Sequence, residues 1–265
     1  MSGTSDPEAG SAPADPADVA AAEPEPIEDP AGSGADGVGP VRAVGIGPGN
    51  PEYLTPRGER AIREADVVVG FSTVVEFVAG VTDADLLACG YRDEAETLAA
   101  FAERVAGGER GVAVLMGDPN HSGYQFVGKV QRAVDAPVRV IPGISSLQVA
   151  ASRARTPMEG TTFVTLHKSG PIEADLERLA AAVGDRHLLV LPRPFDWMPG
   201  DVAAFLLDRG ADADLDALVC ERLTHEDEAI RRYTLEGLAE HAGGDGRDDT
   251  PFSDLSVLAV RRTAR

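Results

Sequence analysis

Cysteine is scarce in this chain, and long apolar runs are missing. The two cysteines, Cys89 and Cys220, lie far apart and form no CxxC pair, which argues against a disulfide framework and a cysteine-based zinc site. No apolar run approaches the ~20 residues of a membrane span. The N-terminus has no basic head followed by an apolar block, so no signal peptide is expected. We therefore expect a cytoplasmic protein with no membrane partner and no metal site.

Positive charge is also scarce, because the net charge is -20 and only two lysines, Lys129 and Lys168, occur beside the arginines. A surface of this kind repels nucleic acid phosphates and anionic lipids, so no nucleic-acid partner is expected. Strong acidity with few lysines resembles the proteins of salt-in halophiles. An ordinary acidic mesophilic protein is the alternative, and the charge says little about chemistry.

Residues 1–39 are almost free of large apolar side chains and consist mainly of Ala, Pro, Gly, Asp and Glu. Such a segment cannot bury enough surface to offset the entropy lost on ordering. We predict a disordered acidic tail here, with the folded part starting near Val41.

Short apolar runs alternate with helical patterns from Val41 onward. The pattern predicts strands at 41–47, 65–70, 85–90, 111–117 and 138–143, with helices at 73–79, 93–106, 122–134 and 145–154. One more helix begins at Thr55-Pro56, where Thr is a favourable N-cap and Pro suits the first helical position. Continuous apolar strands between helices indicate a parallel sheet that is covered on both faces.

The pattern starts again after the linker at 154–160. Strands are expected at 161–167, 187–193 and 255–262, helices at 172–183, 199–209 and 236–241, and a hairpin from 217–223 to 229–235. The fold class is therefore α/β with two α/β domains, about 41–155 and 160–265, and a mixed sheet in the second domain.

The first strand is followed by the loop VGIGPGNPEYLTP, which only partly resembles a dinucleotide-binding fingerprint. Asn50 occupies the place of a third glycine, and the next helix begins only near Pro56 rather than directly after the turn. No GxxxxGK[ST] motif is present, so a nucleoside triphosphate site of that kind is not expected. A long Gly/Pro loop at a strand end suits a pocket wall, and a plain connector is the alternative.

Two further loops follow strands of the same predicted sheet. In MGDPNHSGY, Gly117 permits close approach to the backbone, and Asp118 either caps the turn or accepts hydrogen bonds from a ligand. In VIPGISSLQVAASRA, Ser145 or Ser146 opens a helix, either as an N-cap or as a ligand contact. Because ligands of open α/β sheets bind outside the carboxyl ends of the strands, we expect the three loops to meet at one site.

Together, VGIGPGNPEYLT, MGDP and VIPGISSLQVAASRA resemble the tetrapyrrole (corrin/porphyrin) methylase superfamily, from about Val41 to the C-terminus. These enzymes transfer methyl groups from S-adenosyl-L-methionine, and their two α/β domains hold the active site in the cleft between them. The stretch PGISSLQVAASRARTPMEGTTFVTLHKSG is most similar to the precorrin-7 (cobalt-precorrin-7) C(5)-methyltransferases of cobalamin biosynthesis. The resemblance implies a methyltransferase acting on a precorrin or cobalt-precorrin.

The resemblance also implies which residues bind the cofactor. They are Pro48, Met116, Gly117, Asp118, His121, Ser145 and Ser146 from the first domain, with Leu166, Leu191 and Pro192 from the second. One departure concerns His121, because family members often have Gly and an aromatic residue after GDP, whereas this chain has Asn120-His121-Ser122.

Methyl transfer needs proximity and orientation rather than a protein nucleophile, because the tetrapyrrole supplies the attacking carbon. His121 and His167 are the candidate general bases for the proton that this carbon loses, and a structural role is the alternative for each. Arg153, Arg155, Arg193 and Lys168 are candidates for binding substrate carboxylates. Related enzymes are commonly dimers, so a homodimer is expected, with a separate C(15)-methyltransferase/decarboxylase as a further partner.

Three alternatives remain open from the sequence. One is another methyltransferase of the same superfamily, acting at a different corrin carbon or on a protein side chain. Another is a non-catalytic relative that binds the ligand without turnover. A nicotinamide oxidoreductase is the third, although the first loop departs from the dinucleotide fingerprint.

Overall fold

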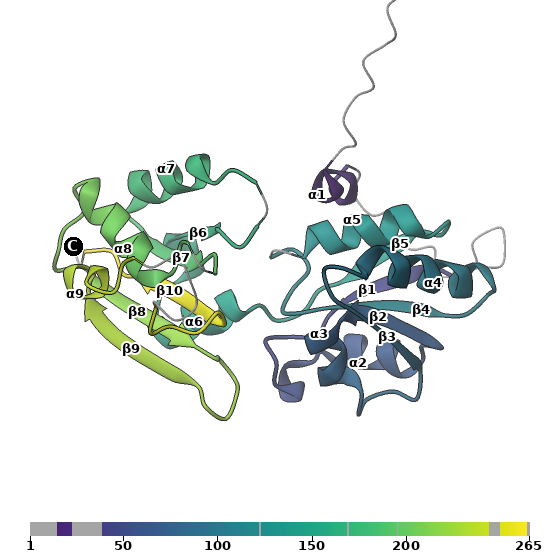
Figure 1. Cartoon of the computed structure of the whole chain (residues 1–265). Helices are drawn as coiled ribbons and strands as arrows, with labels where there is room; N and C mark the ends of the chain where they lie inside the picture. Colours follow the sequence, from purple (N-terminus) through teal and green to yellow (C-terminus); the bar gives the residue numbers. More distant parts are fainter. Residues whose placement is uncertain are drawn as a thin grey trace, which may run out of the picture.

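The computed structural model describes residues 15–22, 39–121, 123–168, 170–194, 196–243 and 250–263. Within these ranges the chain forms two α/β halves, each built on a five-stranded sheet (Figure 1). The predicted fold class is therefore confirmed, and each expected strand and helix of the folded part is present within a few residues of its expected bounds.

The first sheet is entirely parallel, in the order β3-β2-β4-β1-β5. Its strands are β1 (Val41–Gly45), β2 (Val67–Phe71), β3 (Asp85–Cys89), β4 (Gly111–Leu115) and β5 (Val138–Ile141). The connecting helices are α2 (Pro56–Arg63), α3 (Ser72–Val78), α4 (Glu94–Ala106) and α5 (Tyr124–Ala133), and a short 3-10 helix, η1 (Pro51–Tyr53), follows β1. Thr55 caps α2 as expected, because its hydroxyl accepts the Gly58 N–H at 3.1 Å.

Both faces of this sheet are buried, as the continuous apolar strands predict. Successive residues of one strand pack into different cores: Ala43 lies with α4 and α5, whereas Val44 lies with α2 and α3. The largest fully buried side chains of these two cores are Phe101 and Ile62. Burial on both faces explains why the strands lack the polar alternation of a half-exposed sheet.

The second sheet is mixed, in the order β6-β7-β10-β8-β9, with only β6 and β7 parallel. Its strands are β6 (Thr161–Thr165), β7 (His187–Leu191), β8 (Asp216–Glu221), β9 (Ala229–Thr234) and β10 (Ser256–Val260), preceded by the 3-10 helix η2 (Met158–Gly160). The β8–β9 pair is the expected antiparallel hairpin. Helices α7 (Glu173–Ala182), α8 (Pro199–Asp208) and α9 (Leu235–Ala239) cover one face.

Helix α6 (Ser146–Ala154) covers the other face of this second sheet, although the expected boundary near residue 155 assigns it to the first domain. Its side chains Leu147, Val149 and Ala150 pack with Leu189 of β7 and Val257 of β10. The chain therefore crosses between the halves before α6 rather than after it (Figure 1). As a result, the loop between β5 and α6 lies at the junction of the two halves.

The acidic N-terminal segment contains a helix where the sequence predicts no order. Helix α1 (Pro16–Ala20) is capped by Asp15 and lies on α5 (Figure 1). The contact is close, because a side chain at Gly128 would place its Cβ 1.7 Å from the Pro16 carbonyl oxygen. The composition of the segment does not predict this contact, because Ala17, Val19 and Ala20 have small apolar side chains. The helix can nevertheless pack closely on α5, because α5 has a glycine at this position. The rest of residues 1–38 lies outside the described ranges.

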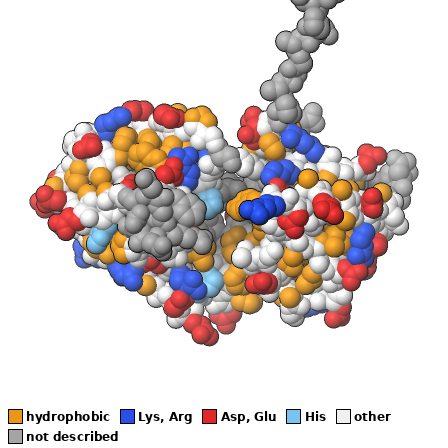
Figure 2. Space-filling view, viewed as in Figure 1, with side chains coloured by type: hydrophobic (Ala, Val, Ile, Leu, Met, Phe, Trp, Pro, Cys, Tyr) orange, Lys and Arg blue, Asp and Glu red, His pale blue; other side chains and the backbone are white. Residues whose placement is uncertain are grey.

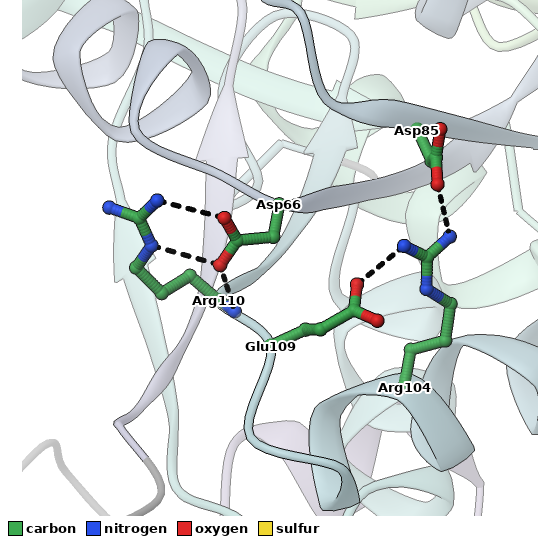
Figure 3. A network of polar contacts seen from close by, with 5 residues as sticks. All are labelled: Asp66, Asp85, Arg104, Glu109 and Arg110. Carbon is green, nitrogen blue, oxygen red and sulfur yellow. Dashed lines mark hydrogen bonds and ion pairs between the residues drawn. The ribbon is translucent and has the colours of Figure 1, made fainter.

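Ion pairs join the amino-terminal ends of the first sheet, away from its carboxyl edge. Asp66, just before β2, accepts three hydrogen bonds from Arg110, just before β4, at 2.8–2.9 Å (Figure 3). Arg104 of α4 bridges Asp85 and Glu109 beside them. The hydrogen bonds from Arg110 hold the pKa of Asp66 well below its ordinary value. These contacts fix the strand ends opposite the loops described next.

We predict that Leu147→Ala lowers the free energy of unfolding by about 2–5 kcal/mol, because it empties a fully buried position between α6 and the second sheet. Chemical denaturation measures the change. Met158→Ala is the control: Met158 is exposed and should change stability by less than about 0.5 kcal/mol. Equal effects of the two substitutions would contradict the packing of α6 on the second sheet.

Candidate functional site

Three glycine loops meet at the carboxyl edge of the first sheet, as the sequence predicts. Gly47 and Gly117 pair as a short antiparallel bridge, with hydrogen bonds of 3.2 and 2.7 Å between their backbones. Both have positive φ values, 86° and 66°, which glycine adopts without strain. The loops after β1 and β4 are therefore joined directly to each other.

Gly45 and Gly143 complete this junction, because their backbones touch that of Gly117. A Cβ at Gly45 would lie 2.6 Å from the Gly117 carbonyl oxygen, and one at Gly143 would lie 2.2 Å from the same atom. No side chain fits at such distances, and the obstacle is backbone that cannot rotate away. The glycines that the sequence motifs share are thus needed, in part, so that three chain segments can touch.

A cavity of about 710 Å³ opens beside this junction and is lined by both halves of the molecule. The first half contributes loops and helix starts at the carboxyl ends of β1, β2, β3, β4 and β5, and the second half contributes the ends of β6, β7 and β8 and the segment before β10. Figure 2 shows a hollow between the two halves, with basic and histidine side chains beside it. A volume of this size accommodates a ligand of cofactor dimensions.

The residues expected at the site come together on this cavity wall, with one exception. Those that line it are Pro48, Met116, Gly117, Asp118, His121, Ser145, Ser146, His167, Leu191 and Pro192. The exception is Leu166, whose side chain is fully buried in the core of the second half. Its backbone pairs with Leu191 O at 2.8 Å, so it supports the wall without forming it.

Asp118 and Ser145 have the capping roles that the sequence offered as alternatives. One carboxylate oxygen of Asp118 accepts the backbone and side-chain N–H groups of Asn120, both at 2.7 Å, and the residue is 8% exposed. Ser145 caps α6, accepting the Leu147 N–H at 3.2 Å, in a capping box with Gln148. Both residues also line the cavity, so local structure and site geometry depend on the same groups.

His121 connects the two halves at the cavity wall. Its ring lies edge-on to that of Phe163 of β6, with 4.9 Å between ring centres. Its Nδ1 atom is buried and has no hydrogen-bond partner among the described residues. Desolvation lowers the pKa of His121, and the charge of Asp118 opposes this only in part. A neutral imidazole on the cavity wall is suited to accept a proton.

His167 lies on the second-half side of the cavity, two residues after the end of β6. Desolvation by the surrounding protein lowers its pKa, and a hydrogen bond to the Pro192 backbone opposes the shift. The two candidate bases therefore line the same cavity from different halves, and the pKa of each is lowered from its ordinary value.

The cations expected to bind carboxylates divide into two groups. Arg193 and Lys168 line the cavity, whereas Arg153 and Arg155 do not. Arg153 instead donates to Glu228 at 2.8 Å, and Glu228 also accepts the Thr224 N–H at 2.7 Å. These contacts hold the β8–β9 turn.

The same turn reaches the first half of the molecule. The Asn50 side chain donates to the Thr224 carbonyl at 3.2 Å, and a Cβ at Gly49 would lie 2.4 Å from the His225 ring. Gly49 and Asn50 belong to the first loop, so this loop contacts the second half directly. The contact helps to fix the width of the cavity.

Several wall residues were not predicted from the sequence, chiefly the aromatic and charged groups at the ends of β2 and β3. The rings of Phe71 and Tyr91 pack in a tilted arrangement with 5.0 Å between ring centres, and Tyr91 is strongly exposed. A glycine occurs at each of these ends too, Gly70 in β2 and Gly90 after β3, but neither belongs to a motif of the kind that marked the other three loops. The rule that ligands bind outside the carboxyl ends of the strands applies to β2 and β3 as well, because all five parallel strands end at one edge.

Neither cysteine is a candidate nucleophile. Cys89 and Cys220 are free thiols that lie in different cores. Burial raises the pKa of each to about 11, so both are protonated at neutral pH. The described residues also contain no cluster of His, Cys, Asp or Glu that could hold a metal, and no helix with the length and apolarity that crossing a membrane requires.

A family model for the tetrapyrrole (corrin/porphyrin) methylases matches residues 40–239. The chain belongs to this family. This confirms the resemblance in the sequence motifs and the enzyme class, a C-methyltransferase that uses S-adenosylmethionine. The cavity residues fit such a cofactor, since Met116 and Leu191 offer apolar surface, Asp118 and Ser145 offer polar groups, and nothing lies within 3.4 Å of a Cβ placed at Gly117.

Individual relatives agree with this assignment. The chain is 30% identical over 218 residues to a probable cobalt-precorrin-7 C(5)-methyltransferase of Methanocaldococcus jannaschii, covering 82% of this chain and 95% of the relative. It is 25% identical to the cobalt-precorrin-4 C(11)-methyltransferase of the same organism, covering 78% and 83%. The fold matches a uroporphyrin-III C-methyltransferase of Thermus thermophilus solved with S-adenosylhomocysteine, with a TM-score of 0.65, 24% identity and coverage of 84% and 92%.

Gly143→Ala should lower the free energy of unfolding by about 1–3 kcal/mol, because the added methyl group meets the Gly117 backbone. The matched control is Gly80→Ala, where a Cβ meets nothing within 4 Å and stability should change by less than about 0.5 kcal/mol. Thermal or chemical unfolding of the two variants measures the difference. A Gly143→Ala protein as stable as the control would refute the backbone junction.

The ring signals of His121 and His167 should titrate below the ordinary value of 6.5 in nuclear magnetic resonance spectra of the folded protein. Because the folded state then binds fewer protons than the unfolded state, both residues favour folding above pH 6.5. This contribution is lost as the pH falls from 6.5 through the lowered pKa values. A midpoint at or above 6.5 for either ring would contradict its desolvation.

Proposed function

We propose that this enzyme methylates the C(5) meso carbon of precorrin-7 or cobalt-precorrin-7 in cobalamin biosynthesis. The observation that carries the proposal is the 30% identity to the C(5)-methyltransferase relative, which extends over 95% of that protein. The proposal is also supported by the similarity to this subfamily of the stretch PGISSLQVAASRARTPMEGTTFVTLHKSG. Methylation at another corrin carbon is the alternative, supported by the 25% identity to the C(11)-methyltransferase.

In this proposal the cavity holds the methyl donor and the macrocycle together. When bound, S-adenosylmethionine would supply an electrophilic methyl group to the electron-rich ring carbon of the substrate, with adenosylhomocysteine as the leaving group. The glycine junction, Asp118 and Ser145 position the donor, while apolar wall residues such as Met116 and Leu191 exclude water. Holding two reactants in line in this way is worth on the order of 7–11 kcal/mol in well-oriented reactions.

The remaining step is loss of a proton from the methylated carbon. His121 is our first candidate to accept it, because it lines the cavity and its lowered pKa favours the neutral imidazole. His167 is the second candidate, on the facing side of the cavity. A homodimer, and a separate enzyme for C(15) methylation and decarboxylation, remain parts of this proposal.

The direct test is to incubate the purified protein with methyl-labelled S-adenosylmethionine and a set of precorrins and cobalt-precorrins. Mass spectrometry and carbon-13 spectra of the product then give the number and the position of the methyl groups. Transfer to C(5) of precorrin-7 or its cobalt form is the expected result. Transfer at another carbon would favour the alternative, and cofactor binding without any transfer would indicate a non-catalytic relative.

Asp118→Ala should weaken adenosylhomocysteine binding at least tenfold in calorimetry, because the carboxylate both holds the loop after β4 and faces the cavity. Asp118→Asn keeps an oxygen that accepts the Asn120 hydrogen bonds, so it separates the turn from the charge. We expect the Asn variant to keep wild-type stability and an intermediate affinity. Unchanged affinity in the Ala variant would rule out Asp118 as part of the donor site.

A further inference from the structure

Both lysines of the chain line the cavity, although the chain has 24 basic residues. Lys129 lies on α5 in the first half, and Lys168 follows β6 in the second half. A chain that uses arginine almost everywhere thus has its two ammonium groups on two sides of one site.

Each lysine is held by a buried carboxylate. The Lys129 Nζ lies 2.5 Å from Glu94 Oε2, and the Lys168 Nζ lies 2.5 Å from Asp175 Oδ2. The side chains of Glu94 and Asp175 are 11% and 8% exposed, whereas the lysine side chains are 37% and 36% exposed. Both lysines therefore line the cavity with partly exposed side chains, while the carboxylates that hold them are buried.

Of the two arginines on the described wall, Arg222 is held by Asp227 through Nε, and Arg193 is more fully committed. Arg193 commits Nε and Nη2 to Asp196 at 2.8 and 2.6 Å, and its Nη1 donates to the Gly170 carbonyl at 3.3 Å. A guanidinium used in this forked manner has few donors left for a ligand. An ammonium has three donors, and one ion pair leaves two of them available.

We propose that Lys129 and Lys168 are two carboxylate-binding points that fix the rotation of the macrocycle within the cavity. This inference rests on the proposed function, since it assumes a tetrapyrrole that carries carboxylate side chains. Such a ring has a nearly four-fold outline and fits a flat cavity in several rotations. Two charged contacts, one from each half, select a single rotation and so determine which ring carbon meets the methyl donor.

The charge of the whole protein makes these contacts important for affinity. With a net charge of -20, the surface repels a polycarboxylate, and only local cations offset this repulsion. Charge-assisted hydrogen bonds from an ammonium group to a carboxylate are stronger than hydrogen bonds between neutral groups. The two lysines therefore act as specificity-determining residues rather than as groups that take part in the bond changes.

The test uses the fact that the chain has only two lysines. Wild-type protein is acetylated with a limiting amine-reactive ester, and peptide mass spectrometry measures the rate at Lys129 and at Lys168. The rates are compared without ligand, with the octacarboxylate uroporphyrin, and with a porphyrin that carries cationic side groups. Porphyrin binding is measured separately by absorbance.

Uroporphyrin should slow acetylation of both lysines at least threefold, whereas the cationic porphyrin should not. Uroporphyrin binding that leaves both rates unchanged would overturn this inference alone and leave the proposed function standing. A protein that binds no carboxylated tetrapyrrole would contradict the inference together with the proposed substrate class.

Substitutions give a second, independent measurement. Lys129→Gln and Lys168→Gln should each weaken uroporphyrin binding at least tenfold, while the affinity for adenosylhomocysteine stays within twofold. The matched control is Arg60→Gln, which removes one positive charge from an exposed position of α2 outside the cavity wall and should leave both affinities unchanged. Equal loss of uroporphyrin affinity in all three variants would indicate a net-charge effect and refute the two-point contact.

Discussion

The contact among three chain segments at Gly45, Gly117 and Gly143 is the constraint on which the site depends. Their backbones lie so close that a single methyl group at Gly45 or Gly143 would meet main-chain atoms. This contact brings the ends of β1, β4 and β5 together before any side chain is considered. The residues that follow these glycines in the three loops, such as Pro48, Asp118 and Ser145, therefore lie on one wall of the cavity.

The second constraint is electrostatic. An acidic protein that binds an acidic substrate needs local positive charge, yet exposed cations on such a surface are readily neutralised by neighbouring acids. Among the described residues, the cavity cations are each held by a carboxylate, as in Lys129 with Glu94 and Arg193 with Asp196. The type of side chain decides how many hydrogen-bond donors remain for a ligand. An arginine that binds a carboxylate through two nitrogens has few left, whereas a lysine in one ion pair keeps two of its three donors.

The sequence predicted the fold closely, because its signals are local. Apolar runs gave the strands, Thr55 marked the start of α2, and glycine marked the three loops at the cavity. The predicted site residues share one wall for the same reason, apart from Leu166, whose position just after β6 did not reveal that its side chain turns into the core.

The features that sequence reasoning missed depend on contacts between distant segments. The assignment of α6 to the second sheet follows from packing with β7 and β10, which no local pattern encodes. The Glu94–Lys129 pair joins α4 to α5, and the Phe71–Tyr91 contact joins the ends of β2 and β3. Such pairs become visible only when the sheet order brings the elements together.

The most direct test of this account is a crystal structure of the protein with adenosylhomocysteine bound. We predict that the compound lies against Gly117 and Asp118 on one side and the loop after β7 on the other, in contact with both halves of the molecule. Density for the compound at any other place, or contact with one half alone, would contradict the account.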